Sequence, residues 1–291
     1  MDSERDTYSE SNLKRLHWEL YDILGEIQRV CGILGIKCFI QGGSAIGAFF
    51  EKAILPWDDD VDVGMLRPDF EKFLREAPKH LRQAYFLQWV GSEKHMPHSM
   101  AKVRKNGTSF MEHGFGHVPM HHGIFVDIMP YDRVPDNQTL QSLQRGTLRF
   151  LALCIMNQEV WGWKYFKKST VAEPATDRVF TCFFVFVVSS LFSKKFIYRL
   201  YSAVSAMFNG WNTEYYSQAK EYRDHISAAS LENLQLVPFG PLMSYVPNHL
   251  ETYLRHHYPN LRRTIPKEEQ QTHCPAALQF SEDSANFANE I

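Results

Sequence analysis

The clearest hydrophobic pattern lies near the start of the chain. Between Asn12 and Ile36 apolar residues recur at steps of three and four, which predicts a long amphipathic helix that stops at Gly35. Shorter apolar stretches and turn residues follow this helix. They predict strands at Lys37–Ile40, Tyr85–Val90, Met100–Arg104 and Gly123–Pro130, with helices at Ala45–Phe50 and from Pro68 to Ala77.

The second half of the chain has a different pattern. Beyond Asp132 the apolar positions indicate helices, at Gln138–Val160, Val179–Phe192, Lys195–Phe208 and Pro247–His257. From about Ala276 the sequence is polar, and residues 276–291 are expected to be a disordered tail. We therefore divide the chain into a strand-rich core at 1–135 and a helical region with a C-terminal segment at 136–275, packed on the core.

One helical segment is unusually apolar. Residues 179–192 form a run of 14 without a charge, and Lys194 and Lys195 follow it. About 20 residues are needed to cross a bilayer, so the run is too short for a confident span. A buried helix is the first expectation, and a shallow peripheral membrane contact flanked by lysines is the alternative.

Composition narrows the classes of function. The 291 residues carry 31 Lys and Arg against 33 Asp and Glu, so no global positive field attracts nucleic acid. Five cysteines, an odd number without C-x-x-C spacing, favour a reducing compartment over a disulfide framework. Residues 1–16 are polar and charged where a signal peptide has an apolar core, so we expect a cytoplasmic protein, with the inner face of the membrane as the alternative.

An acidic cluster is the strongest chemical feature. The segment Asp58-Asp59-Asp60-Val61-Asp62 places four carboxylates immediately before an apolar stretch. If it is a strand, Asp58, Asp60 and Asp62 share one face. Unit charges about 4 Å apart repel by roughly 4 kcal/mol at an effective dielectric near 20, so a cation is expected among them. Oxygen ligands favour Mg²⁺ or Mn²⁺ and phosphate chemistry. An exposed acidic turn is the simpler interpretation.

Two further features bear on this chemistry. Asp127 interrupts the apolar strand 123–130, where an unpaired charge would be costly, so it is expected to meet a metal or another cation. A pairing with arginine or a loop cap is the structural alternative. Gly42-Gly43-Ser44 opens a predicted helix whose amides could receive a phosphate, although a Gly-Gly pair is more often only a turn.

Together these motifs resemble the LicD family of phosphocholine transferases. The resemblance rests on Gly42-Gly43-Ser44, on Leu55-Pro56-Trp57 with the acidic cluster, and on the segment Phe125–Asp132; fukutin-related proteins look similar over the same motifs. It implies an α+β fold, with a nucleotidyltransferase-like mixed sheet, flanking helices and an added helical region. Residues 1–135 would then be the catalytic core.

The resemblance also implies site residues. Asp60, Asp62 and Asp127 would be the catalytic carboxylates and would hold the metal, with Gly42, Gly43 and Ser44 at the nucleotide phosphates. Lys102 and Arg104 alternate onto one strand face and are expected to bind phosphate or carboxylate. The chain departs from the family at Phe50, Glu51 and Ala53, where the family usually carries an Arg-His pair and a glycine.

The implied function is metal-dependent transfer of phosphocholine, or a related phospho-alcohol, from CDP-choline or a similar donor. The acceptor would be a sugar hydroxyl of a cell-surface glycan, a lipopolysaccharide or teichoic acid precursor in free or lipid-linked form. A nucleotidyltransferase that uses a nucleoside triphosphate on a small hydroxylated acceptor is one alternative. The departures at Phe50, Glu51 and Ala53 support another, a degenerate binding module of the same fold.

Overall fold

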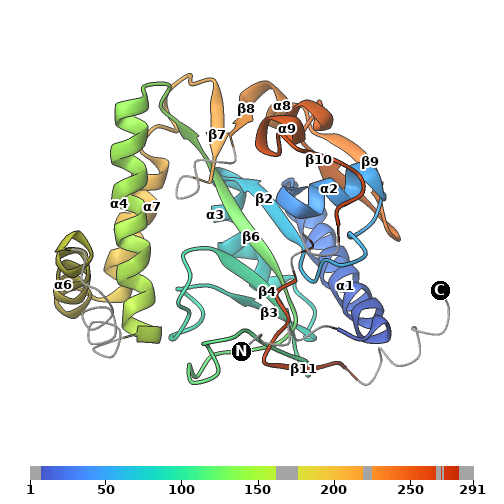
Figure 1. Ribbon diagram of the computed structural model, residues 1–291, viewed down its shortest axis with the longest axis horizontal. Coiled ribbons are helices and arrows are strands. Elements are labelled where there is room, and N and C mark those ends of the chain that lie inside the picture. The colour runs from blue at the N-terminus through green and yellow to red at the C-terminus, as the bar shows by residue number, and fades with distance from the viewer. Residues whose placement is uncertain (1–7, 162–175, 219–224, 267–269, 271, 282–291) are drawn as a thin grey trace.

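A central mixed sheet organises the computed structural model, which describes residues 8–161, 176–218, 225–266, 270 and 272–281. The strand order is β3-β4-β6-β2-β1-β10-β9. Figure 1 shows the long strand β6 crossing the middle of the molecule. The bounds of the seven strands are β3 Tyr85–Gln88, β4 Ala101–Lys105, β6 Phe125–Val134, β2 Asp62–Leu66, β1 Phe39–Ile40, β10 Leu242–Val246 and β9 Gln235–Phe239.

Strand directions are mixed. β6 runs parallel to β2 and antiparallel to β4, while β1 is antiparallel to β2 and parallel to β10. The far end of β6 pairs with β7 (Tyr215–Ser217), which in turn pairs with β8 (Ile226–Ser227). The expected α+β class, with a mixed sheet flanked by helices, is confirmed.

Helices α1 (Glu10–Leu34) and α3 (Arg67–Glu76) pack against one face of this sheet and against each other. Ser9 caps the start of α1, and Gly35 ends the helix in the left-handed conformation at φ 63°. Lys105 of β4 points to this face, where its ammonium group contacts Glu19 and Asp22 of α1. Side chains alternate along a strand, so Lys102 and Arg104 point to the opposite face.

Two further helices lie beside the β1–β10 end of the sheet. α2 (Gly42–Phe50) follows β1 directly and packs on α9 (Leu250–His257) and on β9. The hydroxyl of Tyr253, from α9, accepts a hydrogen bond of 3.0 Å from the Gly42 N–H. The start of α2 is thus fixed beside β2.

A separate group of helices, called here the helical unit, lies beyond β6. It consists of α4 (Gln138–Met156), a π-helical turn at Asn157–Trp161, α6 (Thr176–Leu191) and α7 (Lys194–Ala206). Leu148, Leu151 and Ile155 of α4 pack with Val185 and Ile197 in a small core distinct from that of the sheet. Figure 1 shows these helices side by side at the left edge of the molecule.

Several local expectations were wrong. The strand β2 begins at Asp62 rather than Asp58, because the preceding residues make their own turn, with the Asp58 N–H bonded to Leu55 O. The β9–β10 hairpin, short helix α8 (Ala228–Glu232) and the 3-10 turn Ala77–Lys79 were not expected. The tail expected from Ala276 contains strand β11 (Ala277–Gln279), which pairs with β5 (Ser109–Met111) where Leu278 meets Phe110. Residues 282–291 lie outside the described residues.

The apolar run was also expected to be a buried helix, and it is buried only on the face that carries Cys182, Val185 and Ser189. Phe183 and Phe184 of α6 are exposed. Within the described residues no single helix is long and apolar enough to cross a bilayer, and α6 and α7 pass that test only as a pair bent by 115°.

Candidate active site

Two of the predicted acidic residues and one predicted basic residue lie in one row across three neighbouring strands. In the register of the sheet, Asp62 of β2 lies opposite Asp127 of β6, and Asp127 lies opposite Lys102 of β4. Adjacent strands are about 4.8 Å apart, so these three side chains share one small region on the same face. Strand register therefore unites residues that are far apart in sequence.

The segment before β2 is held in place by contacts to distant parts of the chain. Asp59 is buried and accepts hydrogen bonds from the Tyr8 hydroxyl at 2.9 Å and from the His273 N–H at 2.9 and 3.0 Å. His17 Nε2 donates to the carbonyl oxygen of Asp58 at 2.7 Å. With Asp59 turned inward as an anchor, the carboxylates of Asp58 and Asp60 remain for the site.

Proximity and burial change the ionisation of these carboxyl groups. Burial first, and the charges of Asp60 and Asp59 next, raise the pKa of Asp58 to about 8. Burial and then Asp127 raise the pKa of Asp60 to about 6. The pKa of Asp62 is raised well above its usual value by burial and by Asp60 and Asp127. The protein alone therefore does not neutralise this cluster fully, and the site favours a proton or a bound cation.

Asp127 has a partner within the protein. Its Oδ1 lies 3.0 Å from Nζ of Lys102, a lysine that is 1% exposed. Burial raises the pKa of Asp127, and Lys102 acts in the opposite direction. Asp127 was predicted to contact a metal or another cation, and the ammonium group of Lys102 is such a cation.

The two basic residues of β4 are buried inside this face. Lys102 and Arg104 both lie near Glu112, at 3.5 and 3.4 Å, and both stand over the ring of Phe125. Arg104 also donates to Gln88 Oε1 at 2.6 Å and to Gly123 O at 2.7 Å. Of the two predicted interactions, carboxylate binding is the one present here, and phosphate binding by either residue stays a prediction.

The glycine turn lies directly beside the acidic residues. Gly42 has φ 59°, which favours glycine, and a β-carbon there would lie 3.5 Å from Asp62 Oδ2. A β-carbon at Gly43 would lie 3.4 Å from Asp58 Oδ2. Ser44 Oγ accepts a hydrogen bond of 3.0 Å from the Asp62 N–H. The N-terminus of α2, with its positive dipole end, therefore lies at the carboxylates.

Comparison with known proteins agrees with this architecture. Residues 35–150 match the family model described as LicD/FKTN/FKRP, nucleotidyltransferase domain. A protein named lipopolysaccharide cholinephosphotransferase LicD, from Haemophilus influenzae, is 25% identical over 270 residues, which cover 87% of this chain and 92% of that protein. The chain thus contains a segment, residues 35–150, that matches the LicD family.

The LicD-family match extends over the elements that form the site. It begins at Gly35 and ends at Phe150, so it includes the glycine turn, the acidic cluster, β4 and β6, and it stops within α4. Tyr253 and His273, which contact the site from the C-terminal part, lie outside the matched range but within a chain that the Haemophilus protein resembles over most of its length.

The carboxylates of the candidate site offer oxygen ligands of the kind that bind a divalent metal ion. Among the residues that the structure describes, no three acidic, histidine or cysteine side chains are already grouped tightly enough to hold an ion unaided. The donor set nevertheless suits Mg²⁺, which is usually held by one or two carboxylates together with substrate phosphates. Asp60 and Asp62 provide two such oxygen donors, and Asp127 Oδ1 is buried without a hydrogen bond, with only its ion pair to Lys102.

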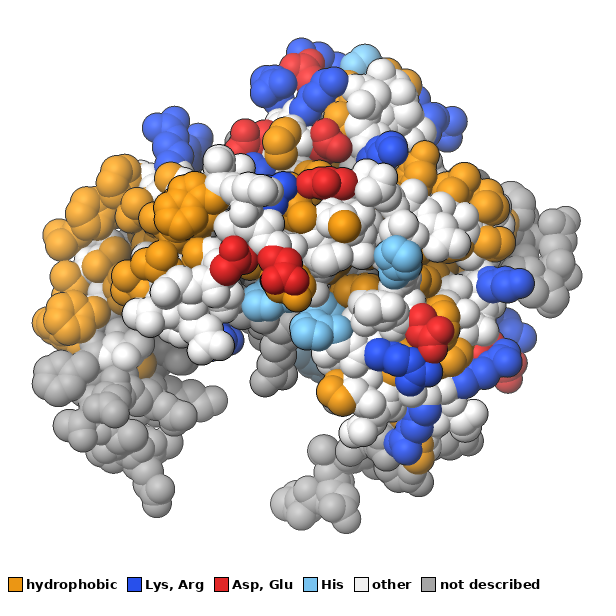
Figure 2. Space-filling view, turned by 90° about the horizontal axis from the view of Figure 1, so that it is seen from above, with side chains coloured by type: hydrophobic (Ala, Val, Ile, Leu, Met, Phe, Trp, Pro, Cys, Tyr) orange, Lys and Arg blue, Asp and Glu red, His pale blue; other side chains and the backbone are white. Residues whose placement is uncertain are grey.

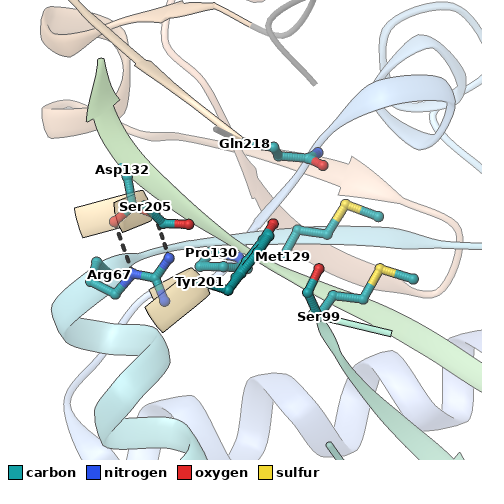
Figure 3. A pocket seen from close by; sticks show the side chains of 9 residues that line it. Arg67, Ser99, Met129, Pro130, Asp132, Tyr201, Ser205 and Gln218 are labelled. Atoms are coloured by element: carbon teal, nitrogen blue, oxygen red, sulfur yellow. Dashed lines mark hydrogen bonds and ion pairs between the residues drawn. The ribbon is translucent and has the colours of Figure 1, made fainter. Parts of the chain in front are cut away.

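A small cavity beside β6 has too little volume to hold a substrate. It encloses about 40 Å³ and is lined by Met129, Tyr201 and Gln218, among others (Figure 3). Ligand pockets typically hold roughly 300–1,000 Å³. Its main feature is the buried, bidentate pair of Arg67 with Asp132, which joins α3 to β6. Asp132 thus has a structural role, since its ion pair joins two elements of the fold.

Sequence reasoning missed several residues around the site. Glu112 and Gln88 were not recognised as partners of the buried basic pair, because that requires the pairing of β3, β4 and β6. The contact of Tyr253 to Gly42 depends on the packing of α9, which the local pattern does not reveal. Glu51, a departure from the family, pairs with Arg263 at 3.0 Å on the surface.

Proposed function

We propose that this chain transfers phosphocholine, or a related phospho-alcohol, from a CDP-activated donor to a sugar hydroxyl of a cell-surface glycan precursor. One observation carries the proposal. The row Lys102, Asp127, Asp62 lies beside the N-terminus of α2, which combines acidic ligands with an anion-binding helix end. The name of the Haemophilus relative supports choline phosphate as the group and lipopolysaccharide as the type of acceptor.

The proposed roles follow from charge and position. Asp60 and Asp62, with Asp127 as the third carboxylate, would hold Mg²⁺ or Mn²⁺, which would neutralise the diphosphate of the donor. The helix end at Gly43 and Ser44 would receive a phosphate. Lys102 counteracts the effect of burial on the pKa of Asp127, because its ammonium group lies 3.0 Å away.

The chemical step is a displacement at phosphorus. The acceptor oxygen forms a bond to the phosphorus that bears choline, the bond from that phosphorus to the bridging oxygen breaks, and CMP leaves. One carboxylate of the site accepts the proton of the sugar hydroxyl. The protein contributes mainly by positioning the two reactants and by compensating charge, as in phosphoryl transfer generally.

A second candidate is nucleotidyl transfer from a nucleoside triphosphate to a small hydroxylated acceptor. It is favoured by the description of the matched family model, which is a nucleotidyltransferase domain. The two reactions leave different products, CMP in the first and pyrophosphate in the second.

Donor identity and turnover are testable together. Thermal shift with a panel of CDP-alcohols and nucleoside triphosphates, each with Mg²⁺, should show the largest stabilisation with CDP-choline or a close analogue, because a ligand bound only by the native state raises its stability. CMP and pyrophosphate are then measured during turnover with the stabilising donor. Pyrophosphate without CMP would favour the second candidate.

The acidic residues are tested by Asp60→Asn and Asp62→Asn. Each should lower turnover by about 10²–10³-fold, the range expected when one electrostatic contact to a transition state is removed. Asp136→Asn is the matched control, since Asp136 is exposed and lies outside the site. Melting curves check that all three variants fold. Unchanged turnover in Asp60→Asn and Asp62→Asn would reject the site.

A further inference from the structure

Helix α6 carries large apolar side chains on its exposed face, in addition to the apolar residues Cys182 and Val185 that it buries. On α6 the buried positions include Cys182 and Ser189, while Phe183 and Phe184 are 50% and 55% exposed. Water-facing helices normally place their large apolar residues inward. Here the larger aromatic groups point away from α4, so the packing of the unit does not account for them.

The exposed apolar side chains form one continuous feature, called here the apolar patch. It extends from α6 through the bend into α7 and comprises Phe183, Phe184, Leu191, Phe192, Phe196 and Leu200. Phe192 and Phe196 are stacked across the bend at 5.2 Å between ring centroids. Figure 2 shows hydrophobic side chains gathered on the left side of the molecule, over the helical unit. Large contiguous patches of this kind indicate an interaction surface.

Charge around the patch indicates the kind of partner. From Thr181 to Thr213 the sequence contains no Asp or Glu, while it contains Lys194, Lys195 and Arg199. Lys194 is paired with Glu159 at 2.7 Å, but Lys195 and Arg199 are exposed beside the patch. The whole chain is slightly acidic, at a net charge of −2, so this basic character is local. An apolar surface bordered by exposed basic residues complements an anionic lipid surface.

We infer that the apolar patch with Lys195 and Arg199 docks α6 and α7 into the headgroup region of an anionic bilayer. The bend of 115° between the two helices suits a surface-lying element better than a crossing one. The inference does not depend on the phosphotransferase reaction, because it is carried by exposure and charge outside the candidate active site.

The attachment of the helical unit gives this docking a structural consequence. Lys194 Nζ binds the backbone oxygens of Lys94 and Met96, in the loop after β3. At the other end of α7, Asn209 Nδ2 donates to Asp132 of β6 at 2.8 Å. Both ends of α7 are therefore fixed to the sheet, so that a bilayer bound by α6 and α7 would also orient the catalytic sheet.

Vesicle flotation tests the inference with the full chain. Vesicles of phosphatidylcholine mixed with phosphatidylglycerol should carry the protein upward, and vesicles of phosphatidylcholine alone should carry much less. The triple variant Phe184→Ser, Leu191→Ser, Phe196→Ser should bind at least about tenfold more weakly. Its control is Leu236→Ser with Met243→Ser, since these residues are similarly exposed, at 49% and 51%, on the β9–β10 hairpin.

A charge variant provides a second measurement. Lys195→Ala with Arg199→Ala should weaken binding to the anionic vesicles by about tenfold, and added salt should weaken wild-type binding. The control Lys14→Ala with Arg75→Ala removes the same net charge from exposed sites on α1 and α3.

Three results would overturn the inference, two from flotation and one from sedimentation. Absence of flotation by the wild-type chain, or equal flotation of the triple variant and its control, would overturn the inference. Sedimentation velocity tests the other occupant, a second copy of the chain. A wild-type dimer that the triple variant converts to a monomer, without vesicle binding, would also overturn it. Melting curves confirm that each variant is folded.

Discussion

The central sheet and the helical unit differ in which side chains they bury and which they leave exposed. In the sheet, fully buried positions include charged groups such as Lys102 and Arg104, and each has a carboxylate within 3.5 Å. In the helical unit, buried positions include small residues such as Cys182 and Ser189, while phenylalanines face outward. The sheet contains buried ion pairs, which cost stability, and the helical unit leaves apolar side chains exposed to solvent.

This difference indicates where function constrains each region. Burying an ion pair is costly, and an apolar replacement of both partners is often as stable, so buried pairs are poor evidence of selection for stability. Exposed aromatic residues likewise add nothing to the folded core. In both regions the unusual residues are better explained by chemistry or binding than by folding, which is what the proposed active site and the apolar patch require.

The largest stability effect is expected from removing the buried cation of the sheet. Lys102→Met leaves Asp127 and Glu112 without the ammonium group that lies 3.0 and 3.5 Å away, and should cost about 3–5 kcal/mol of unfolding free energy. The exposed Lys195→Met in the helical unit should change stability by less than about 0.5 kcal/mol. Urea denaturation of both variants measures the contrast.

A double variant sharpens this test. Lys102→Met with Asp127→Asn removes both members of the pair, so part of the lost stability should return while turnover stays low. If Lys102→Met alone is as stable as the wild type, the pair does not carry the charge balance of the site.

The next-largest effect on stability is expected at a buried leucine, and an exposed leucine provides the comparison. Leu24 of α1 is fully buried, and Leu24→Ala should destabilise the chain by about 2–5 kcal/mol. Leu191 of α6 is 72% exposed, and Leu191→Ala should change the free energy of unfolding by less than about 0.5 kcal/mol. Thermal melts of both variants provide the measurement. A large cost at Leu191 would show that the apolar patch is covered in the free protein.

Much of the sheet region was predictable, because its signals are local. The period of α1 and its stop at Gly35 are both confirmed, as are α3 after Leu66 and the buried strand that contains Asp127. The acidic residues were predicted as a metal site from charge repulsion, from the apolar surroundings of Asp127 and from the resemblance to the LicD family, without the register that brings Asp62 opposite Asp127.

What could not be predicted depends on pairing between distant segments. Nothing in the local pattern shows that Lys102 is buried, since this follows from its position opposite Asp127 in the register of β4 and β6. The same holds for Asp59, which becomes an anchor only when Tyr8 and His273 reach it. For the helical unit, periodicity gave the helices but not their exposed face, because the apolar run of α6 is hydrophobic on nearly every side.

The smallest effect concerns the pH dependence of the acidic cluster without metal. The pKa of Asp60 is raised from 3.8 to about 6, so the folded state binds this proton more tightly than the unfolded state. Its contribution to stability is therefore complete below about pH 4 and is lost as pH rises toward 6. Asp58, with a pKa of about 8, extends the loss to higher pH. Metal-free protein should melt at lower temperature at pH 8 than at pH 5.

Asp60→Asn removes the charge that causes part of this loss. At pH 7.5 without metal it should raise stability by about 1–2 kcal/mol, a value reduced because a third of the Asp60 side chain is exposed. At pH 4 it should have almost no effect, because Asp60 is then protonated in the folded state and carries no charge that repels its neighbours. Saturating Mg²⁺ should invert the order at pH 7.5, since a metal ligand must be deprotonated and the variant has lost one. Calorimetry under these three conditions measures these changes, and the control Asp136→Asn, at the exposed bend before α4, should show none of this dependence. A gain in Asp60→Asn that is equal at pH 4 and 7.5 would mean that Asp60 is strained by packing and not by charge.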